Sequence, residues 1–349
     1  EVRTALNGCY NGLQKTLIEE WTLTELRSDN SIMGTAGSTS TVNRDLSDLD
    51  MFMPNTSHLG NYTYWSSVYY NIRNINLVLK ALNVNYSVTS GAITYGTITI
   101  PISDADRKVL AAEATFLRAY HYFNLVRLYG GVFLIHEPTS PDDAKNINRS
   151  SVSDIYKLIE ADLQHAATNG IATTFNASPT GAAAANVGKA TTWAAKSLLA
   201  KVFLTQGKKT SAIPLLDDVI ANSGYSLQAN YSNVFSINNE MNSEILFAVR
   251  YKAGGLGLGS PFPNSFAPLQ SGSAVVNGDG KGYNFPTTDI MTSYFNIPIT
   301  NATTTSGSTS VLLPAANANI RVGMYITATQ IPANTTITAI SGLTITLSQ

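Results

Sequence analysis

The chain has little charge, one cysteine and no long apolar run. Its 349 residues include 22 Lys and Arg and 23 Asp and Glu, which gives a formal net charge of −1 and only 13% charged residues. Soluble domains usually carry about 25% charged residues. Without a basic stripe the chain cannot release the counterions that drive nucleic-acid binding, and it lacks the polybasic clusters that hold proteins to anionic lipid. We therefore expect no nucleic-acid partner.

The single cysteine, Cys9, excludes an internal disulfide framework and a thiolate metal cluster. No stretch reaches the roughly 18 apolar residues of a membrane span, and no signal segment opens the chain. The first residue is Glu1 and not Met, which favours an export segment or leader that has been removed. The last residue, Gln349, lies inside strand-like sequence, so we expect a fragment of a longer chain.

Apolar residues recur at helical spacing before residue 225, which predicts a mainly α fold. Single helices are expected at about 3–20, 64–82, 104–129 and 151–168. Asp104 or Asp106 is expected to cap the third of these, Gly130 to end it, and Ser151 or Ser153 to cap the fourth. The chain between them is predicted to form a polar loop over 29–62 and a short β-like segment at 92–100.

Residues 188–224 read as two further helices joined by a tight turn at Gly207, with Ser211 as the second cap and Pro214 inside the first turn. The small and apolar positions of this pair resemble a tetratricopeptide repeat. Stacked pairs of this kind form a scaffold and not a catalyst. The predicted architecture is therefore a tetratricopeptide-like helix-pair scaffold with long loops.

The pattern changes towards the C-terminus. Residues 225–295 predict short strands and long loops, and from about Thr300 the chain alternates Thr, Ile and Val, with Ser341 and Gly342 suited to a hairpin turn. We predict two domains. They are a helical domain at 1–296 and a small Thr-rich β module or insertion at 297–349, possibly truncated.

Several segments, in this order, resemble the SusD/RagB family of outer-membrane nutrient-binding lipoproteins. The segment AAEATFLRAYHYFNLVRLYGGVFLI at 111–135 is similar to the family's signature helix. Supporting segments are ELRSDN at 25–30, the spacing of Trp65, Tyr69, Ile72 and Asn76, and the segments at 151–166, 188–208, 242–251 and 285–294. The resemblance covers most of residues 1–295 and ends after Tyr294. The segment that follows instead resembles small β modules of surface and phage-tail proteins.

The resemblance implies a non-catalytic protein of the Bacteroidetes outer membrane. Such a protein would bind an oligosaccharide or polysaccharide at the cell surface and deliver it to a SusC-like TonB-dependent transporter. It would be held by a lipid anchor on a cysteine that lies before Glu1. One alternative is a peptide-binding uptake lipoprotein of the same family. Another is a structural or adhesive surface protein that acts through its β tail.

Catalytic sequence patterns are missing from the chain. It has no HExxH, GxSxG, Walker or strand-linked GxGxxG pattern, so we expect neither an enzyme nor a cofactor. Paired carboxylates for glycoside hydrolysis depend on their separation in space and not on sequence. Two weak patterns leave open a structural calcium ion. They are Asp45, Asp48 and Asp50, and Asn277, Asp279 and Gly282.

A neutral sugar offers hydroxyl groups and an apolar CH face, so its site needs exposed aromatic rings flanked by polar groups. Aromatic residues concentrate near 62–70, where Trp65 and Tyr69 share one helix face and Tyr62 is expected on the preceding loop. Core packing is the competing interpretation of the same spacing. The candidate ligand-binding residues are Trp65, Tyr62, Tyr64 and Tyr69, and, as the resemblance implies, Arg27, Asp29, Asn30, Tyr251, Phe262 and Phe266.

Charged groups within 111–135 have a different interpretation. Glu113, Arg118 and Arg127 are expected to form buried or half-buried ion pairs that fix helix packing. His121, which has no second histidine at metal-binding spacing, is expected to pack or to make a structural hydrogen bond.

Overall fold

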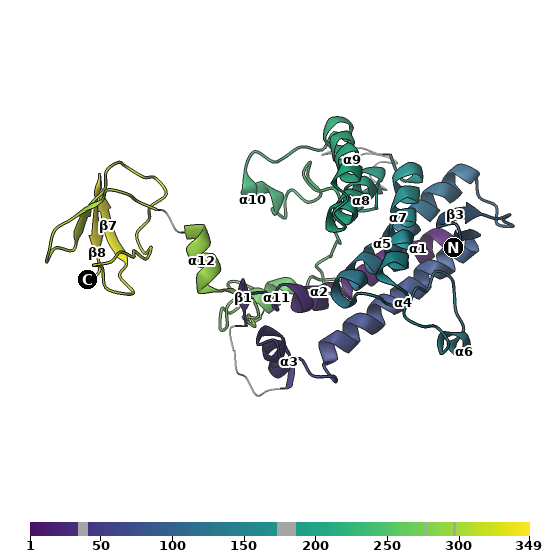
Figure 1. Ribbon diagram of the computed structural model, residues 1–349, viewed down its shortest axis with the longest axis horizontal. Helices are drawn as coiled ribbons and strands as arrows, with labels where there is room; N and C mark the ends of the chain where they lie inside the picture. The colour runs from purple at the N-terminus through teal and green to yellow at the C-terminus, as the bar shows by residue number, and fades with distance from the viewer. Residues whose placement is uncertain (34–40, 173–185, 277, 296–297) are drawn as a thin grey trace.

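The computed structural model describes residues 1–33, 41–172, 186–276, 278–295 and 298–349, and most of it is an assembly of helices (Figure 1). The helices are α1 Val2–Gln14, α2 Leu17–Thr24, α3 Thr41–Asp50, α4 Leu59–Ala81, α5 Asp104–Tyr129, α6 Pro141–Ala144, α7 Val152–Asn169, α8 Thr192–Thr205, α9 Lys209–Asn222, α10 Tyr231–Val234, α11 Phe262–Phe266 and α12 Thr288–Phe295. The strands are β1 Ser31–Ile32, β2 Val84–Ser87, β3 Ala92–Tyr95, β4 Phe285–Pro286, β5 Thr303–Thr304, β6 Ser310–Leu312, β7 Ile337–Ser341 and β8 Thr344–Leu347. The predicted mainly α fold is confirmed.

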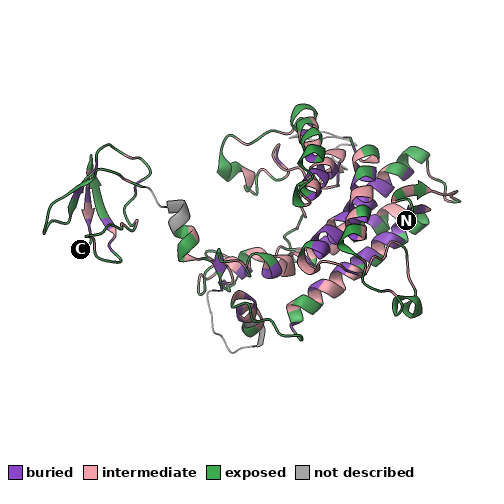
Figure 2. Cartoon of the chain, viewed as in Figure 1, coloured by how far each residue is buried: buried purple, intermediate pink, exposed green. Residues whose placement is uncertain are grey.

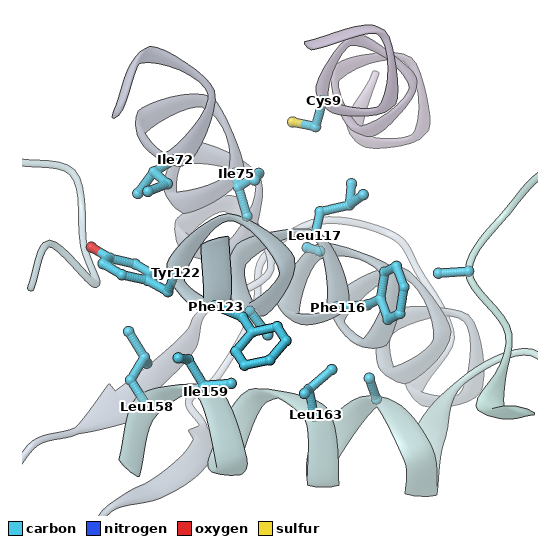
Figure 3. Close-up of a cluster of buried hydrophobic side chains, with 14 of the residues drawn as sticks. Cys9, Ile72, Ile75, Phe116, Leu117, Tyr122, Phe123, Leu158, Ile159 and Leu163 are labelled. Carbon is cyan, nitrogen blue, oxygen red and sulfur yellow. The ribbon is translucent and has the colours of Figure 1, made fainter. Parts of the chain in front are cut away.

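Helix α5 is the centre of the core. Its residues from 110 to 119 and from 121 to 126 are all buried, so neighbours cover the helix on all sides. Helices α1 and α4 pack on one side of it and α7 on another (Figure 3). Phe116, Leu117 and Phe123 lie between these layers. Burial is concentrated in the same helices (Figure 2).

Two ion pairs lie in this core, as predicted. Arg118 pairs with Asp162 of α7 at 2.7 Å, and Glu113 pairs with Arg3 of α1 at 2.6 Å. Arg127 differs from the prediction, because it donates hydrogen bonds to the Asn124 side chain and the Phe123 carbonyl and forms no ion pair with a described carboxylate. His121 makes the expected structural hydrogen bond, at 2.8 Å between its Nε2 and the amide nitrogen of Asn71.

The helix pair α8 and α9 forms as predicted, with Gly207 at φ +75° in the turn between them. The predicted cap Ser211 is wrong. Helix α9 already begins at Lys209, so Ser211 lies in its first turn and Pro214 lies one turn deeper than expected. The cap of α5 also differs, because Ser103, one residue earlier than predicted, accepts the hydrogen bond from the Asp106 amide. Ser151 caps α7 as predicted.

The expected first helix is two helices, because α1 ends at Gln14 and Thr16 bonds back to the Leu13 carbonyl at 3.0 Å. The segment predicted as a polar loop contains β1 and α3, and α4 begins at Leu59. His58 caps α4, with its Nδ1 accepting from the Asn61 amide at 3.2 Å. Sequence reasoning missed histidine as a cap.

Residues 225–295 form less strand than predicted. Among the described residues of this stretch, β4 is the one assigned strand, and α10, α11 and α12 are short helices. Strand β4 pairs antiparallel with β1, with Ser31 opposite Pro286. The early and late parts of the chain are therefore joined here.

The C-terminal strands form a four-stranded antiparallel sheet in the order β5-β6-β8-β7 (Figure 1). The predicted hairpin is present between β7 and β8, with Gly342 at φ +59°. The sheet has a small apolar core of its own, made of Val311, Leu313, Ile320, Ile337, Ile345 and Leu347. None of these described residues belongs to the helical core. The division into domains at residue 296 stays a prediction.

Candidate functional site

Four aromatic rings gather at the surface where α4 begins and α5 ends. The Trp65 ring lies 4.9 Å from Tyr69, 5.1 Å from Tyr129 and 5.9 Å from Phe133, measured between ring centroids. The contacts to Tyr129 and Phe133 are edge-to-face, the geometry that aromatic quadrupoles favour. We call Trp65, Tyr69, Tyr129 and Phe133 the Trp65 cluster. All four side chains are partly buried.

Three backbone features position the cluster. Trp65 and Tyr69 are one turn apart on α4, and Tyr129 is the last residue of α5. Gly130, at φ +70°, then turns the chain so that Phe133 returns beside α4. The Tyr69 hydroxyl donates to the Phe133 carbonyl at 2.9 Å, and the Tyr129 hydroxyl donates to the Asn61 side chain at 2.6 Å. The rings are therefore held in place before any ligand arrives.

Two further candidates lie beside this cluster. Tyr62 is 70% exposed and lies three residues before Trp65. It belongs to α4, whereas the sequence predicts it on the preceding loop. Arg27 is exposed, and its charge reaches Tyr129: burial raises the pKa of Tyr129 to about 12, while the Arg27 guanidinium acts to lower it. The surface thus combines aromatic rings, a phenol in solvent and a cation.

Tyr64 is not available as a platform in this structure. Its side chain is 0% exposed and belongs to the helical core, and burial raises the pKa of its hydroxyl. The physical reason is the helical period, because a residue adjacent to Trp65 points about 100° away around the axis. The prediction for Tyr64 as a ligand residue is therefore corrected to a packing role.

The remaining candidates fall into two other places. Phe262 and Phe266 of α11 stack 5.2 Å apart, and Phe266 lies 4.7 Å from Trp21 of α2. The side chains of Asp29 and Asn30 are exposed, while their carbonyls accept hydrogen bonds from Thr287. Tyr251 lies against α1, where its hydroxyl donates to the Gln14 carbonyl at 3.2 Å.

Acidic side chains near 45–50 serve local structure. Asp45 accepts from the Leu59 amide at 3.3 Å, and Asp50 accepts from the Met33 amide at 3.5 Å. In the other pattern, Asp279 accepts from the Gly272 amide, and Asn277 lies outside the described residues. Within the described ranges, no three His, Cys, Asp or Glu side chains are arranged so that they could hold a metal ion.

Sequence reasoning did not select Tyr129, Phe133 or Asn61 as site residues. Tyr129 and Phe133 lie more than 60 positions from Trp65, and only the return of the chain after Gly130 brings them to it. An available signal was the glycine pair that ends α5, with Tyr129 directly before it and Phe133 two residues after it.

Comparison with known proteins identifies a family for this chain. Residues 2–204, more than half of the chain, match the model of the SusD-like family described as "Starch-binding associating with outer membrane". The chain belongs to this family. The description names binding and not catalysis, in agreement with the sequence analysis. None of the described helices is both long and apolar enough to cross a bilayer.

Curated relatives are considerably longer than this chain. A SusD-like protein of Bacteroides ovatus is 30% identical over 200 residues, which are 54% of this chain and 32% of that protein. SusD-like protein P25 of Formosa agariphila is 26% identical over 210 residues, 58% of this chain and 36% of its own length. The chain therefore spans about a third of the relatives that it matches.

Solved structures agree on the fold. A laminarin-binding SusD-like protein superposes with a TM-score of 0.66 at 23% identity, over 83% of this chain and 62% of that one. Surface glycan-binding protein A from Bacteroides thetaiotaomicron, solved with laminarihexaose, gives a TM-score of 0.66 at 17% identity, over 84% and 60%. At these identities the likeness shows a shared SusD-like fold.

Proposed function

We propose that this protein captures an oligosaccharide at the cell surface without cleaving it, and that the Trp65 cluster with Tyr62 and Arg27 forms the binding surface. The main observation in support is that Trp65 is fixed by edge-to-face packing, while Tyr62, one turn away on the same helix, is 70% exposed. Membership of a family described as starch-binding supports the same function.

The physical match is with a sugar. A pyranose ring presents an apolar face that stacks on an aromatic ring, which contributes on the order of 1 kcal/mol. The Arg27 guanidinium supplies donors for hydroxyl oxygens. Since the rings are already held by Tyr69 and Tyr129 through their hydroxyl hydrogen bonds, little ordering accompanies binding. A few such contacts give affinities of roughly micromolar to millimolar, which suit a step that must release its ligand.

The proposal extends to delivery. The ligand would pass to a SusC-like TonB-dependent transporter, and a lipid anchor outside this sequence would hold the protein at the outer membrane. The family description, which includes association with the outer membrane, supports this location. Asp29, Asn30, Phe262 and Phe266 form a second candidate surface near α2, and Tyr251 a third position beside α1.

Two alternatives make different demands on the molecule. A peptide ligand would pair its backbone with an exposed strand edge. The pair β1 and β4 has two residue pairs, the pair β2 and β3 has four, and the edge strand β7 of the C-terminal sheet has five residues. An adhesive protein that acts through 297–349 would retain its activity when the Trp65 cluster is altered. The resemblance of that module to surface and phage-tail proteins remains a prediction.

The test is affinity gel electrophoresis on laminarin and starch, followed by calorimetry with laminarihexaose and maltohexaose, with a peptide library in parallel. Laminarin is chosen because a structural neighbour is described as binding it. The variants are Tyr62→Ala and Trp65→Ala, with Tyr70→Ala as the matched control, since Tyr70 is 60% exposed on the same helix.

Retardation by one glucan that is reduced in Tyr62→Ala and Trp65→Ala but kept in Tyr70→Ala supports the proposal. Binding that is unchanged in all three variants moves the site away from α4. Binding of peptides and of no glycan overturns the sugar ligand. Activity that survives in the Trp65 variant but is lost when 297–349 is deleted favours the adhesive alternative.

A further inference from the structure

A pocket of about 280 Å³ lies on α1, away from the Trp65 cluster, and the mechanism proposed above does not use it. One wall is α1, whose Asn7, Asn11 and Gln14 follow one another at one-turn spacing. The other walls are the segments 187–189 and 247–250. Segments from three distant parts of the sequence therefore build it.

The α1 wall presents side-chain amides. The Asn11 amide donates to the Gln14 side-chain oxygen at 2.9 Å, and the Gln14 amide donates to the Arg250 carbonyl at 2.6 Å. These bonds orient the amides and join α1 to the opposite wall. Amide groups both donate and accept hydrogen bonds, as the hydroxyl groups of a sugar do.

The opposite wall presents two cations. Lys189 and Arg250 both line the pocket. Gly188, at φ +82°, lets the Arg250 side chain lie against the backbone, because a Cβ there would approach the Arg250 Cδ to 2.7 Å. A larger residue at 188 would displace the guanidinium. The position of the Arg250 side chain therefore depends on a glycine at 188.

These cations have little local compensation. None of the described residues that line the pocket is Asp or Glu. The Lys189 ammonium donates to an amide oxygen, that of Asn186, at 3.0 Å. Among the described residues, Arg250 forms one ion pair, with Glu240 at 3.2 Å, and both side chains are about half exposed, so solvent screens that pair. The nearby carboxylate of Glu113 is already bound by Arg3.

The apolar part of the pocket is aromatic. Phe247 lines it, and its ring is fixed by contacts with Phe116 at 5.0 Å and Tyr10 at 6.5 Å. The volume lies just below the range of about 300–1,000 Å³ that is usual for small-molecule sites, so one monosaccharide-sized group is the fitting occupant.

We infer that this pocket binds an acidic saccharide unit, with Lys189 and Arg250 on its carboxylate or sulfate and the α1 amides on its hydroxyl groups. The inference rests on the proposed function in that the ligand is a glycan. It adds that the glycan carries negative charge, and it assigns that charge to a second site.

The test titrates the full chain, with its lysines ¹³C-labelled by reductive methylation, which preserves the ammonium charge. Lys189→Met identifies the Lys189 signal. The probes are D-glucuronate and glucose 6-sulfate, the neutral D-glucuronamide, and acetate and N-acetyl-aspartate as anions without a sugar. Lys201 serves as the internal control, because it is exposed on α8 and does not line the pocket.

We expect an acidic sugar to shift the Lys189 signal saturably while the Lys201 signal stays unchanged. Glucuronamide should bind at least about tenfold more weakly, since hydrogen bonds to a charged group are the stronger ones. Arg250→Gln should lower the affinity for the acidic sugar by a similar factor. Lys201→Met, which changes the net charge equally, should leave this affinity unchanged. Circular dichroism checks that each variant is folded.

Equal binding of glucuronamide and glucuronate would overturn the inference, as would the absence of any Lys189 shift. If acetate bound as tightly as glucuronate, the ligand of the pocket would be a simple anion and not a sugar. If N-acetyl-aspartate did so, the ligand would be an acidic peptide. The neutral glucan assay on Tyr62 and Trp65 is independent of these results. Glucan binding that is unchanged in the Tyr62 and Trp65 variants, or that is absent from the parent protein, together with an intact Lys189 response, would contradict the first site and leave the second.

Discussion

Arg118 of α5 and Asp162 of α7 form a buried two-point ion pair, with 2.7 Å from Nη2 to Oδ1 and 2.8 Å from Nε to Oδ2. The second terminal nitrogen of Arg118 donates to Asn76 of α4 at 3.0 Å and to the His136 carbonyl at 2.9 Å. Four segments of the core therefore meet at one guanidinium. Removing one partner would leave the other charge buried without compensation.

We expect Arg118→Met or Asp162→Asn to lower the free energy of unfolding by about 3–5 kcal/mol. Urea unfolding followed by circular dichroism measures it. The double variant Arg118→Met with Asp162→Leu should recover most of the loss, since no charge remains buried. Lys157→Met is the control, because it breaks an exposed pair with Asp154 and should change little. Single variants as stable as this control would contradict the assignment.

Two glycines of α1 should respond in opposite directions to alanine. A Cβ on Gly12 would overlap the Asn71 side chain, whose amide is held by the Cys9 carbonyl at 3.0 Å and by His121. A Cβ on Gly8 would meet nothing within 4 Å. Gly8→Ala should therefore stabilise the protein by up to about 1 kcal/mol through helix propensity. Gly12→Ala should destabilise it, because α1 must move from α4.

The midpoint of thermal unfolding decides between these outcomes. The pair is matched, since both positions lie in the same helix and gain the same methyl group. If Gly12→Ala raised the midpoint as Gly8→Ala does, the close approach of α1 and α4 at Asn71 would be wrong.

The long helices could be predicted because each carries an apolar stripe long enough to fix its period. Helix α7 is a clear case, with Ile155, Leu158, Ile159 and Leu163 on its buried face. The break at Thr16 and the strands β1 and β4 could not be predicted in the same way. A two-residue strand carries no periodicity of its own, and β1 is defined by a partner far along the chain, at Phe285 and Pro286.

The candidate site shows the same division. Trp65 and Tyr69 could be placed together because one helix turn joins them. Tyr129 and Phe133 join them only through the packing of α5 on α4 and the turn at Gly130, which a single sequence does not encode locally. The prediction for Tyr64 failed because its aromatic type suits both a core and a platform.

Two buried histidines should make stability fall as the pH decreases. Burial lowers the pKa of His121 to about 3 and that of His165 to about 4, the charge of Arg118 adding to the second shift. In the unfolded chain a histidine has a pKa near 6.5, so below that pH the unfolded state binds more protons and is stabilised relative to the folded state. Each residue therefore costs about 2 kcal/mol of stability between pH 7 and pH 5.

The measurement compares the urea midpoints of the parent protein and His121→Gln at pH 7 and pH 5. Glu19 and Glu20, whose pKa values are raised by burial, act in the opposite direction, so the difference between the two proteins is the informative quantity. The variant should lose about 2 kcal/mol less over this interval. An equal loss in both proteins would show that His121 is protonated in the folded state.

The C-terminal sheet should unfold separately from the helical core. Ile345 of β8 is 0% exposed in the apolar core of the sheet, and that core shares no described residue with the helical one. Ile345→Ala should therefore cost the sheet about 2–5 kcal/mol. Calorimetry should show one transition shifted and the main one unchanged. Leu343→Ala, at a position 40% exposed in the adjacent turn, is the milder control. A single transition that moves as a whole would mean that the two cores are coupled.

Tyr62 and Trp65 should separate binding from stability. Tyr62 is 70% exposed, so Tyr62→Ala should change the free energy of unfolding by no more than about 0.5 kcal/mol. Trp65 packs on three rings, so Trp65→Ala should cost about 3 kcal/mol or more. Both variants should lower the affinity for a glucan by about fivefold or more, because each loses one stacking ring. Calorimetry at a temperature where both variants remain folded measures the affinities. A Tyr62 variant with full stability and full affinity would show that the sugar lies elsewhere on the protein.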